Sequence, residues 1–181
     1  MAKDGMLVDF GEYIRGYIRD IPDFPQPGIL FRDITPLLKD GPALRKVIQY
    51  LADYYRNQKL ELVVGPESRG FLFGAPLAYE LGIGFVPVRK PGKLPATVAR
   101  VEYALEYGTD ALEIHTDGVQ EGQRVLIVDD LLATGGTTQA SVQLLEQLGG
   151  RVVGMAFLIE LTALGGRNKL TDYDILSLVK Y

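Results

Sequence analysis

One short stretch, Arg124–Thr138, restricts what this chain can fold into more than any other. Its first five residues are mostly apolar and predict a buried strand. Asp129 and Asp130 follow where that strand is expected to end, and a small-residue loop then leads into an amphipathic helix. Unpaired backbone N–H groups and the positive end of the helix dipole point into a loop of this kind. The stretch therefore predicts an anion site at a strand–loop–helix turn.

The composition of the loop indicates which anion it suits. Gly135 and Gly136 let the backbone approach a bulky phosphate, and Thr134, Thr137 and Thr138 add hydroxyl donors. The two adjacent carboxylates repel a phosphate and suit hydroxyl groups or a metal ion instead. The stretch thus favours a sugar phosphate, with the phosphate at one end and a hydroxylated or magnesium-bound centre at the other.

Two other phosphate-binding loops are excluded. The Walker A motif needs a lysine after its second glycine, whereas here the glycines are adjacent and no lysine follows. The dinucleotide fingerprint needs a third glycine, but Gly82-Ile-Gly84 is followed by Phe-Val-Pro.

Strands and helices alternate along the rest of the chain. Hydrophobic periodicity predicts helices over residues 7–21, 42–55, 71–81 and 138–148, a weak helix over 162–170, and strands over 60–64, 84–88, 124–128, 152–159 and 175–179. Most of these strands are continuously apolar, which is typical of a parallel sheet covered by helices on both faces. The sequence therefore predicts the α/β class.

Two segments interrupt the alternation. Ile21–Ile34 contains three prolines and a glycine, which exclude a helix and predict an irregular segment. Periodicity alone favours a packed connector there over a lid that grips a flat ring. Leu94–His115 alternates in polarity and predicts a hairpin with its turn at 107–110. We expect both segments over the carboxyl edge of the sheet.

Cations follow two of the predicted strands. Arg69 opposes the dipole of the helix that it precedes, so an anion should lie nearby, and it could bind phosphate bidentately. Arg89-Lys-Pro-Gly-Lys93 ends a strand, where ligands bind in open α/β sheets, so we interpret this run as ligand-binding rather than as a solvated turn. His115 is the only histidine, and we interpret it as structural.

Composition excludes several classes of partner. The net charge of −4 disfavours nucleic acid, and no cysteine is present for disulfide or thiolate chemistry. No apolar run approaches the roughly 20 residues of a membrane helix, and residues 1–5 lack a signal pattern. We therefore expect a cytoplasmic protein with no membrane and no nucleic-acid partner.

Val125–Thr138 resembles the 5-phosphoribosyl-1-pyrophosphate motif of type I phosphoribosyltransferases. The segments that extend the resemblance are Phe24–Ile34, Glu67–Gly74, Arg89–Pro95 and Glu102–Gly108. The first and last of these point to the adenine-using members, because those that use hypoxanthine or guanine typically carry a different base-binding hood. The resemblance implies one phosphoribosyltransferase domain over 1–181, with an N-terminal helix and hood at 1–36 and a catalytic hairpin or flexible loop at 94–116.

The resemblance also implies an activity. The expected purine-salvage reaction transfers the 5-phosphoribosyl group to N9 of adenine, giving AMP and pyrophosphate. Magnesium would be held mainly by the substrate, with no direct protein ligands, and the enzyme would be a homodimer. Two alternatives stay open: an enzyme for another purine base such as xanthine, or a non-catalytic regulator that senses the donor. A regulator would usually add a DNA-binding domain, for which 181 residues leave no room.

Residue roles follow from the same resemblance. The 5-phosphate would bind Ala133, Thr134, Gly135, Gly136 and Thr137, and the pyrophosphate would bind Glu67, Ser68, Arg69, Arg89, Lys90 and Lys93. Asp129 and Asp130 would hold the ribose hydroxyls and stabilise positive charge at C1. Adenine would contact Leu30, Phe31, Arg32 and Leu131, with Phe31 stacked on the purine. Glu102 and Tyr103 would be catalytic residues on a mobile loop that excludes water.

The resemblance places a cis peptide at Glu67–Ser68. Pro66-Glu67 stands where relatives often have Leu-Asp, which leaves the role of this backbone open.

Overall fold

A five-stranded sheet forms the centre of the molecule, in a computed structural model that describes residues 10–104 and 109–181. The strand order is β4-β3-β7-β8-β9, and all four pairings are parallel, as predicted. The bounds are β3 Leu62–Pro66, β4 Gly84–Val88, β7 Arg124–Leu132, β8 Arg151–Glu160 and β9 Ile175–Lys180. The carboxyl ends of β3, β4 and β7 therefore meet at one edge, where ligands bind in sheets of this class.

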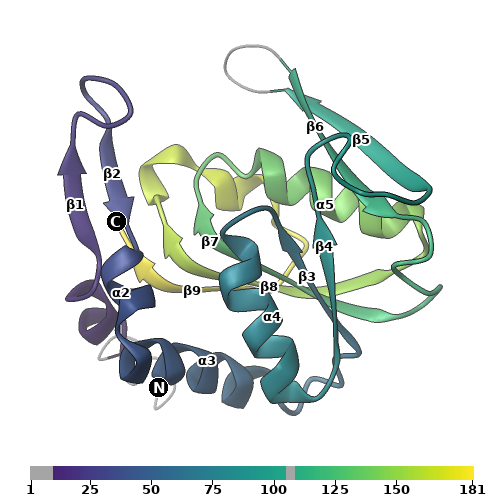
Figure 1. Cartoon of the computed structure of the whole chain (residues 1–181), viewed down its shortest axis with the longest axis horizontal. Coiled ribbons are helices and arrows are strands. Elements are labelled where there is room, and N and C mark those ends of the chain that lie inside the picture. Colours follow the sequence, from purple (N-terminus) through teal and green to yellow (C-terminus); the bar gives the residue numbers. More distant parts are fainter. Residues whose placement is uncertain (1–9, 105–108) are drawn as a thin grey trace.

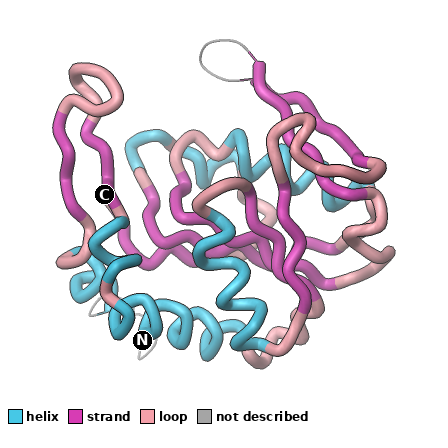
Figure 2. Tube along the Cα trace, in the orientation of Figure 1, coloured by secondary structure: helices cyan, strands magenta, loops and turns pink. Residues whose placement is uncertain are grey.

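Helices cover both faces of this sheet (Figures 1 and 2). Their bounds are α2 Thr35–Lys39, α3 Gly41–Tyr55, α4 Gly70–Leu81 and α5 Gly136–Gln147. Alternate residues of β7 point to opposite faces, so Leu126 and Val128 pack in the core under α3 and α4, while Val125 and Ile127 pack in the core under α5. This explains why the buried strands read as continuous apolar runs.

Caps set the ends of the two helices that flank the core. The Asp40 side chain accepts a hydrogen bond from the backbone N–H of Ala43 at 2.9 Å and so caps α3. After α5, Gly149 adopts φ +79°, and the N–H of Gly150 returns to the carbonyl of Leu145 at 2.8 Å. These caps lie next to the ends of the helices that the sequence predicts over 42–55 and 138–148.

Two antiparallel hairpins stand on either side of one end of the sheet (Figure 1). β5 Val98–Ala104 pairs with β6 Thr109–His115, which confirms the predicted hairpin. Half of its predicted turn, residues 107–108, lies outside the described residues, and the other half already belongs to β6. The second hairpin, β1 Arg19–Pro22 with β2 Leu30–Asp33, was not predicted.

The prediction for the N-terminal region was wrong in two respects. Helical residues end at 15, and Arg19 already begins β1, so the helix predicted over 7–21 is too long. Gly16 follows the helix, and the backbone of 19–22 finds partners in 30–33, which a helical pattern cannot reveal. For the same reason, the segment predicted as irregular contains a strand, and its loop includes a cis Phe24–Pro25 bond.

Two further boundaries differ from prediction. β7 continues through Leu132, paired with Glu160 of β8, so Asp129 and Asp130 lie within the strand rather than after it. The weak helix predicted over 162–170 is two 3₁₀ turns, Thr162–Leu164 and Gly166–Lys169, because the left-handed Gly165 (φ +64°) separates them. Within residues 10–104 and 109–181, no helix combines the length and the apolar character needed to cross a bilayer.

Candidate active site

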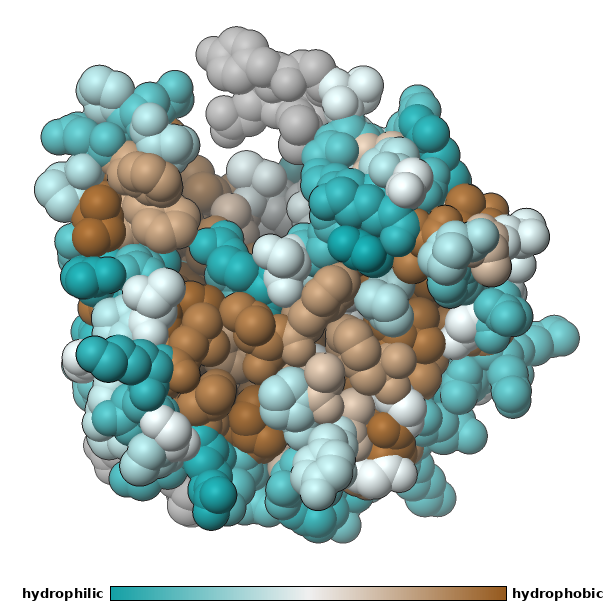
Figure 3. Space-filling view, in the orientation of Figure 1, coloured by the Kyte–Doolittle hydropathy of each residue, from teal (hydrophilic) through white to brown (hydrophobic). Residues whose placement is uncertain are grey.

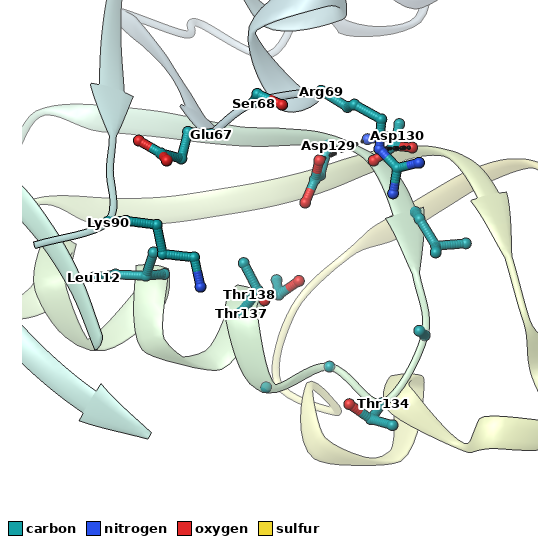
Figure 4. Close-up of a pocket in the computed structure, with 14 residues that line it drawn as sticks. Glu67, Ser68, Arg69, Lys90, Leu112, Asp129, Asp130, Thr134, Thr137 and Thr138 are labelled. Atoms are coloured by element: carbon teal, nitrogen blue, oxygen red, sulfur yellow. Dashed lines mark hydrogen bonds and ion pairs between the residues drawn. The ribbon is translucent and has the colours of Figure 1, made fainter. Parts of the chain in front are cut away.

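A cavity of about 250 Å³ opens at the carboxyl edge of the sheet (Figure 4). The loop after β3, the end of β7, the loop before α5 and the first turn of α5 form most of its wall. The lining residues are Glu67, Ser68, Arg69, Lys90, Leu112, Asp129, Asp130, Leu131 and Ala133–Thr138. The loop that the sequence predicts for a sugar phosphate thus shares one cavity with the carboxylate pair and with part of the predicted pyrophosphate site.

The loop before α5 has the geometry of an anion site. Gly135 lies at the N-cap of α5 with φ +80°, and no side chain caps this helix end. No acidic residue lies in the first turn of α5, so its backbone N–H groups are left for a ligand. Thr138, one of the predicted hydroxyl donors, is buried and also lines the cavity.

The backbone of Gly166 packs against the backbone of this loop. A Cβ on Gly135 would lie 2.8 Å from the Gly166 carbonyl oxygen, and a Cβ on Gly166 would lie 2.2 Å from the carbonyl oxygen of Ala133. Only two glycines allow these two backbones to touch. The sequence reasoning missed Gly166, although the Gly165-Gly166 pair was a signal of close backbone packing.

The two aspartates have different surroundings. Asp130 is 4% exposed, and its Oδ2 lies 2.9 Å from Nε of Arg69. Asp129 is partly exposed toward the cavity, and its Oδ1 accepts the backbone N–H of Asp130 at 2.8 Å. Burial, followed by the charge of Asp130, raises the pKa of Asp129 well above its ordinary value. Burial also raises the pKa of Asp130, although Arg69 opposes this rise.

Arg69 connects two parts of the predicted site. Besides its ion pair with Asp130, its guanidinium carbon lies 5.6 Å from the ring centroid of Phe31 in β2. The anion that we expected near Arg69 is therefore a carboxylate of this chain.

The predicted pyrophosphate residues separate into two groups. Glu67, Ser68, Arg69 and Lys90 line the cavity, and the Glu67–Ser68 peptide is cis, as the resemblance implied. Arg89 and Lys93 do not line it. Both contact Glu67, through Nε of Arg89 at 2.8 Å and Nζ of Lys93 at 2.6 Å. The Lys90 ammonium contacts the Asp110 carboxylate and the Tyr103 hydroxyl.

The predicted hood residues lie mostly outside the cavity. Leu30 is 45% exposed, and Phe31 is half-buried, with its ring 5.2 Å from that of Phe24. The Arg32 side chain turns away, pairs with Asp20 and lies 3.7 Å from the ring centroid of Tyr181. Leu131 is the predicted adenine contact that lines the cavity.

The predicted catalytic residues of the hairpin also lie outside the cavity. Glu102 and Tyr103 are in the strand β5, on the outgoing arm of the hairpin. Glu102 pairs with Arg100 at 2.9 Å, and the Tyr103 hydroxyl donates to Asp110 at 3.2 Å. His115 accepts a hydrogen bond from the backbone N–H of Ala96 at 3.4 Å, in keeping with a structural role.

Comparison with known proteins decides the family. The model of the phosphoribosyl transferase domain matches residues 34–180. The chain belongs to the phosphoribosyl transferase family. Among curated phosphoribosyltransferases, the adenine phosphoribosyltransferase of Thermoanaerobacter sp. (strain X514) is 63% identical over 94% of this chain and 98% of its own length. The predicted family is therefore confirmed.

Solved phosphoribosyltransferase structures agree with the fold. The adenine phosphoribosyltransferase of Thermoanaerobacter pseudethanolicus superposes with a TM-score of 0.92 at 62% identity, covering 94% of this chain and 99% of the other. The Saccharomyces cerevisiae enzyme, solved with an imino-altritol bisphosphate and adenine, gives a TM-score of 0.89 at 39% identity, with coverage of 94% and 99%. This chain thus has the type I phosphoribosyltransferase fold that the sequence predicted.

Proposed function

We propose that this phosphoribosyltransferase transfers the 5-phosphoribosyl group from 5-phosphoribosyl-1-pyrophosphate to N9 of adenine, giving AMP and pyrophosphate in purine salvage. The observation that carries the proposal is the single cavity in which the loop before α5 meets both carboxylates and Lys90. The loop before α5 suits the 5-phosphate of the donor, and Lys90 suits its pyrophosphate. The similarity to adenine phosphoribosyltransferases at 63% identity supports adenine as the acceptor.

Binding of the donor starts from the loop before α5. Backbone N–H groups at Ala133–Thr137 and the threonine hydroxyls would hold the 5-phosphate at the start of α5. Lys90 and Arg69 also line the cavity and would face the pyrophosphate. A donor held at both ends keeps its C1 in a defined place, which favours reaction by positioning.

The carboxylates act at the centre of the bound donor. Asp129 and Asp130 would accept hydrogen bonds from the ribose hydroxyls and stabilise the positive charge that grows at C1 as its bond to pyrophosphate breaks. Adenine is already nucleophilic, so the site does not need a strong base. Phe31 would stack on the purine, and the backbone at Leu30 and Arg32 would bind its edge. Glu102 and Tyr103 would cover the reacting centre from β5.

The cavity residues fit a magnesium ion that arrives with the donor. Asp129 and Asp130 offer carboxylate oxygens, which magnesium prefers together with substrate phosphates. Among the residues that the structure describes, no three His, Cys, Asp or Glu side chains form a group that could hold a metal by themselves. We propose that the phosphates of the donor supply most of the magnesium ligands. When bound, magnesium would neutralise charge on the leaving pyrophosphate.

We also propose a homodimer in the cytoplasm. Leu72 and Tyr79 of α4 are 42% and 87% exposed, and apolar side chains gather over the face formed by α3 and α4 (Figure 3). A surface of this kind suits a subunit interface. Sedimentation equilibrium would test the dimer, and activity assays of cell fractions would test the location.

A pyrophosphate-release assay tests the reaction directly. The protein is mixed with magnesium and the donor, and adenine, xanthine, hypoxanthine or guanine is then added in turn. Release with adenine, with AMP as the second product, is the expected result. Release with xanthine alone would establish the other-base alternative, and donor binding without release for any base would favour a regulator.

A further inference from the structure

Two nearly buried carboxylates hold the loop that follows β4, residues 89–93. Glu67 lies after β3, and its side chain is 8% exposed. Its two oxygens contact different cations of the loop: Oε2 contacts Nε of Arg89 at 2.8 Å, and Oε1 contacts Nζ of Lys93 at 2.6 Å. Glu67 therefore binds both end residues of the loop.

Glu113 of β6 holds the same loop from the other side. It is 7% exposed, and its Oε2 accepts the backbone N–H of Gly92 at 2.9 Å. Its backbone forms an antiparallel bridge with Arg89, with hydrogen bonds of 2.8 and 2.7 Å. The loop is thus fixed between a strand of the hairpin and the cis-peptide loop.

The consequence concerns Lys90, because it is the loop cation that lines the cavity. Arg89 and Lys93 form ion pairs with Glu67, whereas the Lys90 ammonium reaches the cavity wall (Figure 4). We propose that Glu67 is a positioning residue, whose carboxylate binds Arg89 and Lys93 in order to fix Lys90 at the pyrophosphate end of the cavity. This inference rests on the proposed function of the site. It assigns Glu67 a role through the loop rather than as a ligand of the pyrophosphate.

The charge of Glu67 is maintained under the conditions of the reaction. Burial acts to raise the pKa of its carboxyl, but the hydrogen bonds from Lys93 and Arg89 outweigh this and hold the pKa below its ordinary value. Glu67 therefore places a negative charge in the wall of a cavity that has to receive an anion.

The variant Glu67→Gln distinguishes a role through charge alone from a role in positioning the loop, because the two predict opposite changes in the KM for the donor. If the carboxylate acted only through its charge, its removal would favour the anionic donor, and the donor KM would fall. If it positions the loop, both ion pairs are lost, the loop that carries Lys90 is held less firmly although the Lys90 ammonium keeps its contact with Asp110, and the donor KM should rise by about tenfold. The KM for adenine should not change, because the loop does not reach the predicted base site.

A second readout does not depend on turnover. Hydrogen exchange of the backbone amides at residues 89–93 should be faster in Glu67→Gln than in the wild type, because a neutral amide holds the Arg89 and Lys93 side chains less strongly than the carboxylate does. If the wild type released no pyrophosphate with any base, the proposed function would fail, while this exchange experiment would still test the role of Glu67.

Two further variants complete the design. Asp53→Asn removes a carboxylate from the exposed ion pair with Arg56, so it changes the net charge equally at a distance from the cavity, and its kinetics and exchange should match the wild type. Glu67→Asp keeps the charge but shortens the reach, and it should give a donor KM between those of the wild type and Glu67→Gln. It also serves if the glutamine variant does not fold.

The positioning role would be overturned by a donor KM that falls or stays the same in Glu67→Gln. Unchanged exchange at 89–93, or an equal loss of affinity for donor and adenine, would also overturn it.

Discussion

At the scale of single residues, Asp129 and Asp130 show how one strand gives two identical side chains different properties. Neighbouring residues of a strand point to opposite sides. The nearly buried Asp130 therefore pairs with Arg69, whose side chain is 38% exposed, while Asp129 faces the cavity with a pKa raised by burial and by its neighbour. A carboxyl with a raised pKa takes up its proton at a higher pH than an ordinary aspartate.

This difference predicts the pH dependence of the reaction. As the pH falls, the aspartate pair loses negative charge above the ordinary aspartate pKa of about 3.9. The acid limb of kcat/KM for the donor should therefore lie above that value. In Asp129→Asn, kcat/KM for the donor should be about 100-fold lower, and the pH at which the acid limb occurs should change. An acid limb at the same pH in the variant would assign it to another group.

A second residue-scale prediction concerns Gly166. A Cβ there would lie 2.2 Å from the Ala133 carbonyl oxygen, so Gly166→Ala must displace the loop before α5. We expect a loss of about 1–3 kcal/mol in the free energy of unfolding and a higher donor KM. Urea denaturation and initial-rate kinetics measure the two effects. Gly41→Ala is the control, because a Cβ on Gly41 meets nothing within 4 Å.

At the scale of elements, the hairpin of β1 and β2 presents Phe31 beside Arg69. The proposed base site depends on this hairpin, whereas the donor site is built on β3, β7 and α5. Leu131 of β7 is the one proposed adenine contact on these elements. We therefore expect substitutions in the hairpin to affect adenine much more than the donor.

Phe31→Ala tests this separation. Loss of a stacking ring costs about 1–3 kcal/mol per base, so the KM for adenine should rise by roughly 10- to 100-fold with a nearly constant donor KM. Steady-state kinetics with each substrate varied in turn gives both values. Leu164→Ala, at a position that is 47% exposed, is the control. Equal increases in both KM values would contradict the separation of the two sites.

At the scale of the whole molecule, one ion pair joins β8 and β9 to the 3₁₀ turn between them. Glu160 at the end of β8 is nearly buried, and its Oε2 lies 2.6 Å from Nη2 of Arg167. Arg167 also donates to the carbonyl of Ile175 and to Ser177 in β9. The hydrogen bond from Arg167 lowers the pKa of Glu160.

This pair predicts how stability depends on pH. A carboxyl with a lowered folded pKa stabilises the protein above its unfolded pKa of about 4.3, and this contribution is lost as the pH falls through the folded pKa. Glu160→Gln should therefore cost about 1–3 kcal/mol at pH 7 and much less in acid. Urea denaturation across the pH range measures the difference, and a constant difference between pH 7 and pH 3 would contradict it.

The residue pattern was sufficient for the parallel sheet, the main helices and the β5–β6 hairpin. Each has a local cause: continuous apolar runs for the strands, Asp40 as a cap for α3, and alternation for the hairpin. Arg19–Pro22 was predicted wrongly, because its strand exists only through pairing with residues 30–33, and no local signal reports that partner.

For the site, the residue pattern was sufficient to predict the loop before α5, its carboxylates and the family, since these depend on neighbouring residues and a characteristic order. The partners of the charged side chains could be found only from the folded chain. The fold paired Arg69 with Asp130 and directed Arg89 and Lys93 to Glu67, and it placed Gly166 behind Ala133. These contacts join segments far apart in the chain, so they depend on how the sheet brings strand ends together rather than on any local pattern.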